Sequence, residues 1–329
     1  MNDSLMRRAI RLSRKGFPAP NPHVGCVIVK DGEIVGEGYH DHAGGPHAEI
    51  VALRQAGEAA KGADVYVTLE PCNHVGRTGP CSLALIQAEV SRVFVACPDP
   101  NPRAQGGADT LRSTGIPVEV GLLEQQAAAE NLPFLTAMRL SRPYVVVKSA
   151  AGLDGRSALP SGESKWITGE AARRQGRRLR AECGAVLVGY RTVLADDPQL
   201  TARIRGAVNQ PLRVVLDPHA RLSGSENVFD DGARTKRITG MIDLPRILED
   251  LFNEGVTGLL VEGGARTIGH FFQEKLVDRL ELFMAPKLLG EGPSWLEGLR
   301  IETLGEAPAC KIQRVRRIGH DIQVTAAVC

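Results

Sequence analysis

Four residues in the first quarter of the chain have side chains that could hold a metal ion and move protons. His47 and Glu49 stand two positions apart, and Cys72 and Cys81 follow in a second segment. One imidazole and two thiols suit a catalytic zinc centre, which has three protein ligands and an open position for water. A nearby carboxylate that does not bind the metal could carry protons to and from that water. These residue types therefore suggest zinc-assisted hydrolysis.

The order of these residues narrows the chemistry further. The pattern H-x-E followed by P-C-x-x-C is typical of zinc-dependent nucleobase deaminases, in which the glutamate shuttles protons. His47-Ala48-Glu49 and Pro71-Cys72 fit this pattern, although eight residues instead of two separate Cys72 from Cys81. We therefore expect one Zn²⁺ per chain, bound by His47, Cys72 and Cys81. Glu49 would act as the catalytic acid and base while an exocyclic amine is removed by hydrolysis.

Two features around Cys72 bear on this prediction. Pro71 can occupy the first turn of a helix, which would place Cys72 at a helix N-terminus, where the helix dipole favours the thiolate. A structural zinc is the alternative, because His74 could supply a fourth protein ligand. Glu49 would then have no role, so we favour the catalytic site.

The elements that must position these residues alternate between helices and strands. In the first half, Asp31-Gly32 is typical of a hairpin turn. We expect helices at 4–15, 47–55, 82–89 and 124–138, and strands at 24–30, 34–39, 65–69, 93–97 and 118–120. This alternation predicts an α/β fold.

The pattern restarts after Arg142-Pro143, with continuous apolar runs typical of parallel strands. We expect strands at 144–148, 185–189, 213–217, 259–262, 280–285 and 322–328, a weaker strand at 235–239, and helices at 170–180 and 244–252. Glu262 ends a buried strand, where an unpaired carboxylate is costly. The turn Gly263-Gly264 then leads into a helix with Thr267 as its cap. Such a turn lets backbone N–H groups approach a phosphate, and Arg266 suits the 2′-phosphate of NADPH.

Length and composition set the broad class. A chain of 329 residues is long enough for two domains, which we place at 1–142 and 143–329. The net charge of +2 argues against a protein that grips nucleic acid. We expect no membrane span, because no apolar run reaches the required ~20 residues. The charged N-terminus and the odd number of seven cysteines favour a cytoplasmic protein with free thiols.

Four stretches of the first half resemble a known enzyme family. They are Asn21–Val29, Pro46–Glu49, Thr68–Cys72 and Gly76–Cys81. These stretches resemble the deaminase half of the bifunctional deaminase–reductase family of riboflavin biosynthesis. The resemblance implies a cytidine-deaminase-like fold, and 2,5-diamino-6-(5-phosphoribosylamino)pyrimidin-4(3H)-one as substrate. Asn21 matches the position at which such deaminases hold the base.

The resemblance also gives a meaning to the insert between the two cysteines. Asn73, His74 and Arg77 lie in it and could contact the sugar phosphate. Each of them could equally be a solvated residue of a surface loop.

Six stretches of the second half resemble the reductase half of the same family, whose fold is similar to dihydrofolate reductase. They are Lys148–Arg156, Ser161–Thr168, Leu187–Gly189, Thr192–Thr201, Val261–Gly264 and Ala285–Gly290. The resemblance implies that NADPH reduces the ribosyl group of 5-amino-6-(5-phosphoribosylamino)uracil to a ribityl chain. The residues implied to face the cofactor are Ala150, Trp166, Thr192, Asp196, Gly264, Ala265, Arg266, Thr267, Ile268, Gly269 and His270. The residues implied to face the substrate are Ser164, Arg180, Leu200, Arg203 and Glu262.

Physical chemistry is compatible with several of these roles. Arg180 and Arg203 could clamp the substrate phosphate, although Arg180 could also be one more solvated charge on an arginine-rich helix. Lys148 or Asp196 could assist proton delivery. The segment between Pro218 and Leu259 is short for the family, which predicts altered contacts to the adenosine end of NADPH.

Two further expectations and two alternative functions remain. The enzyme should act on a small phosphorylated pyrimidine and form a homo-oligomer. A deaminase whose second domain has lost reductase activity is the first alternative. An RNA-binding protein with a structural zinc is the second, but the low aromatic content of 4% opposes it.

Overall fold

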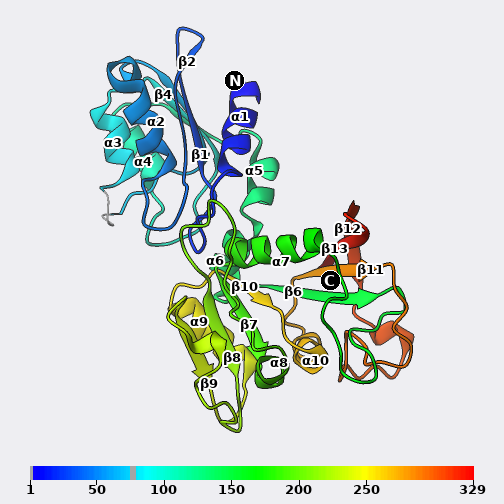
Figure 1. The fold of residues 1–329 in the computed structure, drawn as a ribbon. Helices are drawn as coiled ribbons and strands as arrows, with labels where there is room; N and C mark the ends of the chain where they lie inside the picture. Colours follow the sequence, from blue (N-terminus) through cyan, green and yellow to red (C-terminus); the bar gives the residue numbers. More distant parts are fainter. Residues whose placement is uncertain (1–2, 75–78) are drawn as a thin grey trace. The chain divides into compact units, whose positions relative to one another are not determined.

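The computed structural model describes residues 3–74 and 79–329, which form two compact units, Met1–Leu140 and Ser141–Cys329 (Figure 1). Each unit has its own sheet and its own hydrophobic core. Among the described residues, no helix has the length and apolar character that a membrane crossing requires.

The N-terminal unit is built on a five-stranded sheet in the order β2-β1-β3-β4-β5. Its strands are β1 (Gly25–Lys30), β2 (Glu33–Tyr39), β3 (Asp64–Leu69), β4 (Arg92–Cys97) and β5 (Val118–Val120). β1 is antiparallel to β2 and β3, whereas β3, β4 and β5 run parallel. The hairpin turn is confirmed, because Asp31 and Gly32 adopt φ values of 52° and 84°.

Helices cover both faces of this sheet. Ala48, Ala52 and Ala56 of α2 pack on one face, together with Leu85 and Leu111. On the other face, α1 packs with α5 and α6 against Val27, Tyr66 and Phe94. The helices are α1 (Asp3–Ser13), α2 (Ala48–Ala56), α3 (Cys81–Gln87), α4 (Gly107–Ser113), α5 (Glu124–Glu130) and α6 (Leu132–Leu140).

Two predictions in this unit were wrong in detail. No helix begins at Pro71, because Cys72 lies in the loop after β3 and α3 begins only at Cys81. The single helix expected at 124–138 is broken at Asn131, whose buried side chain bonds to the backbone of His23 instead of continuing the helix surface.

The C-terminal unit has an eight-stranded sheet in the order β12-β13-β11-β6-β10-β7-β8-β9. Its strands are β6 (Tyr144–Gly152), β7 (Ala185–Gly189), β8 (Leu212–Leu216), β9 (Thr235–Ile238), β10 (Gly258–Val261), β11 (Arg279–Ala285), β12 (Cys310–Ile318) and β13 (Asp321–Val328). The strands from β11 to β9 run parallel, and β13 and β12 add an antiparallel hairpin.

Four helices cover this second sheet. On one face lie α7 (Glu170–Cys183), which packs on Tyr144, Val146 and Phe283, and α8 (Tyr190–Asp196). On the other face, α9 (Leu244–Asn253) and α10 (Ala265–Gln273) enclose the largest apolar cluster.

The predicted strand at 235–239 and helix at 244–252 are confirmed as β9 and α9. The expected helix cap at Thr267 was wrong, because Gly264 is the N-cap of α10 and Thr267 lies in its first turn.

Candidate active sites

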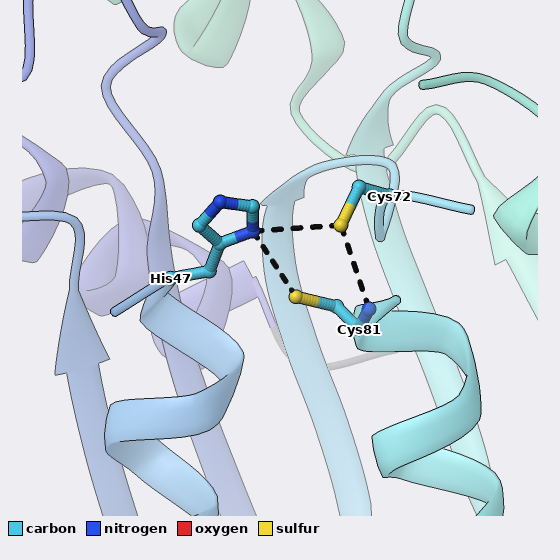
Figure 2. A group of neighbouring side chains, drawn as sticks. All are labelled: His47, Cys72 and Cys81. Atoms are coloured by element: carbon cyan, nitrogen blue, oxygen red, sulfur yellow. Dashed lines mark hydrogen bonds between the residues drawn. The ribbon is translucent and has the colours of Figure 1, made fainter. Parts of the chain in front are cut away.

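Three different segments bring His47, Cys72 and Cys81 together in the N-terminal unit (Figure 2). His47 is the N-cap residue of α2, Cys72 lies in the loop after β3, and Cys81 is the first residue of α3. The Nδ1 atom of His47 lies 3.3 Å from the Sγ atom of Cys81 and 3.4 Å from that of Cys72. All three ligand atoms lie within 4.8 Å of one another. Strand and helix ends therefore point one nitrogen and two sulfurs at a single point.

This geometry fits zinc. With Zn–S bonds of about 2.3 Å and Zn–N bonds of about 2.0 Å, tetrahedral ligand atoms lie roughly 3.5 Å apart. The distances of 3.3 and 3.4 Å match that separation. His74 is exposed and does not join this group of ligand atoms among the described residues. The donor set is therefore that of a catalytic site with one open position.

The electrostatics of the site favour a thiolate at Cys72. A hydrogen bond with Cys81 is the main cause that holds the pKa of Cys72 well below its ordinary value, and His47 adds to it. The backbone N–H of Cys81, at the start of α3, donates to the Cys72 sulfur at 3.4 Å. The helix N-terminus thus acts on Cys72 from a neighbouring residue, although Cys72 itself is not in a helix.

Glu49 lies in the first turn of α2, only 3% exposed. Burial is the largest cause that raises its pKa to about 7; Cys72 raises it further and His47 opposes both. A carboxyl group with such a pKa can take up and release a proton at neutral pH.

Glu70, directly after β3, fixes the loop that precedes Cys72. Its carboxylate accepts hydrogen bonds from the backbone N–H groups of Asp99, Gly106 and Ala108 at 3.0 to 3.2 Å. Burial is the main cause that raises the pKa of Asp99 to about 6. The strand end that carries Cys72 is thereby tied to the loop that follows β4. Neither Glu70 nor its role was predicted from the sequence.

Two of the three candidates for the sugar phosphate, Asn73 and His74, directly follow Cys72 in the chain. Asn73 is exposed, and its side-chain oxygen accepts a hydrogen bond from the hydroxyl of Ser82 at 2.9 Å. The third candidate, Arg77, lies outside the described residues.

Asn21, the residue predicted to hold the base, is connected to His47 through the side chain of His40. Its Nδ2 atom is 3.0 Å from Nε2 of His40, and the His40 ring meets the His47 ring edge-on, with centroids 5.3 Å apart. His40 was missed because a histidine at the end of a strand gives no distinctive signal.

In the C-terminal unit, Arg180, Glu262 and Lys148 form one charged cluster. The Arg180 guanidinium donates to both carboxylate oxygens of Glu262, at 2.7 and 2.9 Å, and to the carbonyl oxygen of Thr201 at 3.1 Å. The Lys148 Nζ atom lies 3.9 Å from Glu262. Burial raises the pKa of Glu262, but Arg180 and Lys148 outweigh it and hold that pKa below its ordinary value. The planar fork of Arg180 thus faces Glu262.

The segment that contains Leu200 and Arg203 lies beside this cluster. Arg203 is exposed, and its pKa is lowered by burial and by the nearby charges of Arg180 and Arg177. Three cationic groups in one place suit a phosphate. The side chain of Leu200 is buried in the core, so only its backbone can meet a substrate. Ser164 is half-buried in a separate loop.

Several residues implied to face the cofactor are also brought together. The hydroxyl of Thr192 accepts a hydrogen bond from the backbone N–H of Gly264 at 3.0 Å, which joins α8 to the start of α10. Lys165 donates to the carbonyl oxygen of Asp196 at 2.9 Å. Trp166 is 63% exposed, with the Arg173 guanidinium 4.6 Å from its ring centroid.

The run from Gly264 to His270 divides into two parts. Ala265, Arg266 and Thr267 form the first turn of α10, and Arg266 lies 3.5 Å from the Glu297 carboxylate. Further along the helix, Ile268 and Gly269 are buried, and His270 is paired with Glu274 at 4.0 Å. Ala150 packs at the edge of the α7 cluster. The side chain of Ile268 therefore belongs to the core, and Gly269 lies against the backbone of Glu297.

Comparisons with known proteins match both units. Residues 143–324 match the family model "RibD C-terminal domain", and residues 1–97 match "Cytidine and deoxycytidylate deaminase zinc-binding region".

Relatives and solved structures extend over nearly the whole chain. The riboflavin biosynthesis protein RibD of Aquifex aeolicus is 42% identical, covering 98% of each chain, and that of Escherichia coli is 43% identical, covering 96% of each. The structure "Acinetobacter baumannii RibD, form 1" has a TM-score of 0.92 at 41% identity, covering 99% of this chain and 98% of that one.

A structure from Thermotoga maritima has a TM-score of 0.90 at 35% identity, covering 99% of this chain and 98% of that one. Its title describes a diaminohydroxyphosphoribosylaminopyrimidine deaminase and 5-amino-6-(5-phosphoribosylamino)uracil reductase. The alignment with the Aquifex protein spans 348 positions, more than the 329 residues of this chain, so that relative has residues that this chain lacks. Taken with the zinc-type ligand set, these matches show that the chain belongs to the RibD family of bifunctional riboflavin-biosynthesis enzymes, with a cytidine-deaminase-like unit followed by a reductase unit.

Proposed function

We propose that the N-terminal unit removes the 2-amino group of 2,5-diamino-6-(5-phosphoribosylamino)pyrimidin-4(3H)-one by hydrolysis, with His47, Cys72 and Cys81 as the zinc ligands. The observation that carries this proposal is the convergence of the three ligand atoms beside the buried Glu49. Bound zinc supplies Lewis-acid activation of a water molecule. The Thermotoga relative is described as a diaminohydroxyphosphoribosylaminopyrimidine deaminase, which supports a substrate of this class.

Glu49 is the general acid and base in this proposal. Its carboxylate takes a proton from the attacking water and delivers protons to the ring nitrogen and to the departing ammonia. Its burial keeps bulk water from exchanging those protons, and its pKa of about 7 suits both transfers. Asn21 holds the heterocycle at the same site.

The C-terminal unit would then reduce the ribosyl group of the deaminated product to a ribityl chain, with NADPH as the hydride source. In this proposal, Thr192, Asp196, Trp166, Ala150 and the run 264–270 hold the cofactor. Within the run 264–270, the first turn of α10 contacts the cofactor. The buried residues Ile268 and Gly269 can contribute backbone groups only.

The substrate would be held at the charged cluster of the same unit. Arg203 and Arg180 attract the phosphate, and the backbone at Leu200 and the side chain of Ser164 complete the contacts. Lys148, whose Nζ atom lies 3.9 Å from the Glu262 carboxylate, or Asp196 delivers the proton to the ring that opens. The Arg180 fork holds the Glu262 carboxylate in a fixed orientation.

Mass spectrometry tests the two-step function directly. The purified protein is incubated with the diaminopyrimidinone phosphate, Zn²⁺ and NADPH, and the product mass is measured. We expect a product that is both deaminated and reduced. A product that is deaminated only would contradict the reductase assignment and favour the alternative of a second unit without reductase activity.

Assembly and location complete the proposal. We infer a homo-oligomer, since enzymes of this kind form symmetric assemblies, and sedimentation of the purified protein tests it. We infer a cytoplasmic location, because the seven cysteines are free.

A further inference from the structure

The backbone around Asn21 is fixed on both sides. The Asn21 N–H donates to the carbonyl oxygen of Pro18 at 2.8 Å. Two residues later, His23 exchanges two hydrogen bonds with the buried side-chain amide of Asn131, at 2.7 and 2.9 Å. These hydrogen bonds fix the backbone position of Asn21. They do not fix which way its side-chain amide is turned.

The side chain of His40 determines the orientation of the Asn21 amide. Its ring is 3% exposed, and its Nδ1 atom lies 3.0 Å from the carbonyl oxygen of Pro46. A carbonyl oxygen can only accept, so the proton of the neutral imidazole must be on Nδ1. The other ring nitrogen, Nε2, is then an acceptor, and it lies 3.0 Å from the Asn21 amide. The Asn21 atom that faces it must be the NH₂ group.

We propose that His40 is a positioning residue that fixes the Asn21 amide with its oxygen turned toward the heterocycle, so that the deaminase site selects a base with an N–H donor at that edge. Among the described residues, nothing donates a hydrogen bond to Oδ1 of Asn21, although the residue is half-buried. The His40 ring contacts both the Asn21 amide and the His47 ring. The oxygen therefore lies within reach of a base bound at the metal site. This inference rests on the proposed deaminase activity.

The chemistry of the proposed substrate agrees with this orientation. A 2-aminopyrimidin-4(3H)-one presents a ring N–H next to the amine that is removed, and the same ring N–H persists in the uracil product. The Asn21 amide oxygen can accept a hydrogen bond from that ring N–H. If the amide were turned by 180°, its NH₂ group would face the ring N–H, and no hydrogen bond could form. A fixed amide thus avoids half of the binding modes that a freely rotating one would sample.

The first test is a double-mutant cycle in the full-length, zinc-loaded protein. His40→Phe keeps an aromatic ring at this position and removes both hydrogen bonds. We expect the KM of deamination to rise about tenfold, the effect of one oriented hydrogen bond, with kcat little changed. In an Asn21→Ala background, His40→Phe should add no further loss, because His40 acts through Asn21.

Rescue and control variants separate positioning from simple structural damage. His40→Gln, whose amide has both a donor and an acceptor, should recover part of the lost affinity. The matched control is His42→Gln, since His42 is a half-buried histidine of the same loop and its Nδ1 atom lies 3.0 Å from the Asp41 carboxylate. We expect it to match the unmodified protein. Each variant should still bind one zinc ion.

A spectroscopic measurement tests the tautomer independently of activity. In a ¹⁵N-histidine-labelled sample, His40 should show a non-protonated Nε2 and a protonated Nδ1, and Asn21→Ala should shift the Nε2 signal. A protonated Nε2 would overturn the proposal.

The kinetic outcomes are distinguishable from failure of the proposed function. If the unmodified protein releases no ammonia, the deaminase assignment itself fails. If it does release ammonia and His40→Phe has an unchanged KM, or if the losses of Asn21→Ala and His40→Phe simply add, the positioning role is wrong. Loss of zinc from His40→Phe together with failure of His40→Gln to recover affinity would equally overturn it.

Discussion

At the scale of single residues, the two sites use buried charge in opposite ways. Glu49 is buried beside a thiolate, and its pKa is raised to about 7 mainly by burial. The side chain of Glu262 is 9% exposed and is paired with Arg180 at 2.7 and 2.9 Å, so its pKa is lowered. The first carboxyl group is ready to exchange protons, whereas the second is held as an anion.

Replacing Glu49 with glutamine separates metal binding from catalysis. Glu49→Gln is close in shape, and it leaves His47, Cys72 and Cys81 in place, so we expect one zinc ion per chain as before. Ammonia release should fall by a factor of about 10² to 10⁴, the usual contribution of a general acid–base group. Zinc content by elemental analysis and ammonia release by a coupled assay check this, and full activity would exclude Glu49 as the proton shuttle.

Breaking the Arg180–Glu262 pair should cost stability in a pH-dependent way. A carboxylate with a lowered pKa stabilises the fold above its unfolded pKa of about 4.3, and this contribution is lost as the pH falls through the lower folded value. Arg180→Met leaves Glu262 buried without its main partner, so we expect the C-terminal unit to lose about 3 kcal/mol at pH 7. The deficit should shrink toward pH 5, because Glu262 in the variant takes up a proton.

Urea unfolding at several pH values measures this deficit. The double variant Arg180→Met/Glu262→Gln should recover much of the loss, because no buried charge is left unpaired. A deficit that stays constant from pH 7 to pH 5 would contradict the assignment to Glu262.

At the scale of elements, a buried arginine holds the segment from Gln199 to Arg203, which we call the substrate segment because it is proposed to bind the reductase substrate, to the sheet. Arg213 of β8 is fully buried, and its guanidinium donates to the carbonyl oxygen of Gln199 at 3.2 Å and to Asp230 at 2.6 Å. It also donates to the hydroxyl of Thr235 at 2.8 Å. One side chain thus connects two strands with the segment that begins at Gln199.

Removing this connection should weaken reductase substrate binding. Arg213→Met is expected to raise the KM for the deaminated substrate about tenfold, or about 1.4 kcal/mol, while deamination is unchanged. Arg237→Met is the matched control, because Arg237 pairs with Asp217 and Leu222 and does not touch the substrate segment. Steady-state kinetics of both half-reactions compare them. Equal effects of the two variants would show a general loss of stability instead.

Elements with strong periodicity or turn signals could be predicted from the sequence, and the others could not. The hairpin at Asp31 and the parallel strands follow from local pattern. β12 was not predicted, because its residues are mostly exposed and so lack an apolar period. α3 at Cys81–Gln87 agrees with the helix predicted at 82–89, whereas the helix start predicted at Pro71 was wrong, because Cys72 lies in a loop and accepts a hydrogen bond from the Cys81 N–H.

The candidate sites divide in the same way. His47, Glu49, Cys72 and Cys81 could be predicted because motif spacing encodes their convergence. The contribution of His40 depends on a contact 19 residues away from it in sequence, which no local pattern encodes. The inward direction of the Ile268 side chain and the burial of Gly269 likewise depend on how α10 packs on the sheet.

At the scale of the whole molecule, two separate cores should allow two separable activities. A chelator that removes zinc is expected to abolish ammonia release and to leave unchanged the NADPH-dependent reduction of separately supplied 5-amino-6-(5-phosphoribosylamino)uracil. The reason is that the described ligand atoms all lie in the N-terminal unit, which has its own hydrophobic clusters. NADPH absorbance follows the second reaction. Loss of both activities on chelation would show that the reductase unit depends on the metal.

The position of β6 has a consequence for the order in which the ribosome completes the two units. β6 is the first strand of its sheet to be synthesised, but its neighbours are β10 and β11, which begin at Gly258 and Arg279. The N-terminal sheet, in contrast, is complete once β5 has emerged. During translation the deaminase unit can therefore fold early, whereas β6 must wait with open edges for more than a hundred residues. A chaperone that binds nascent chains would find its main target in that interval.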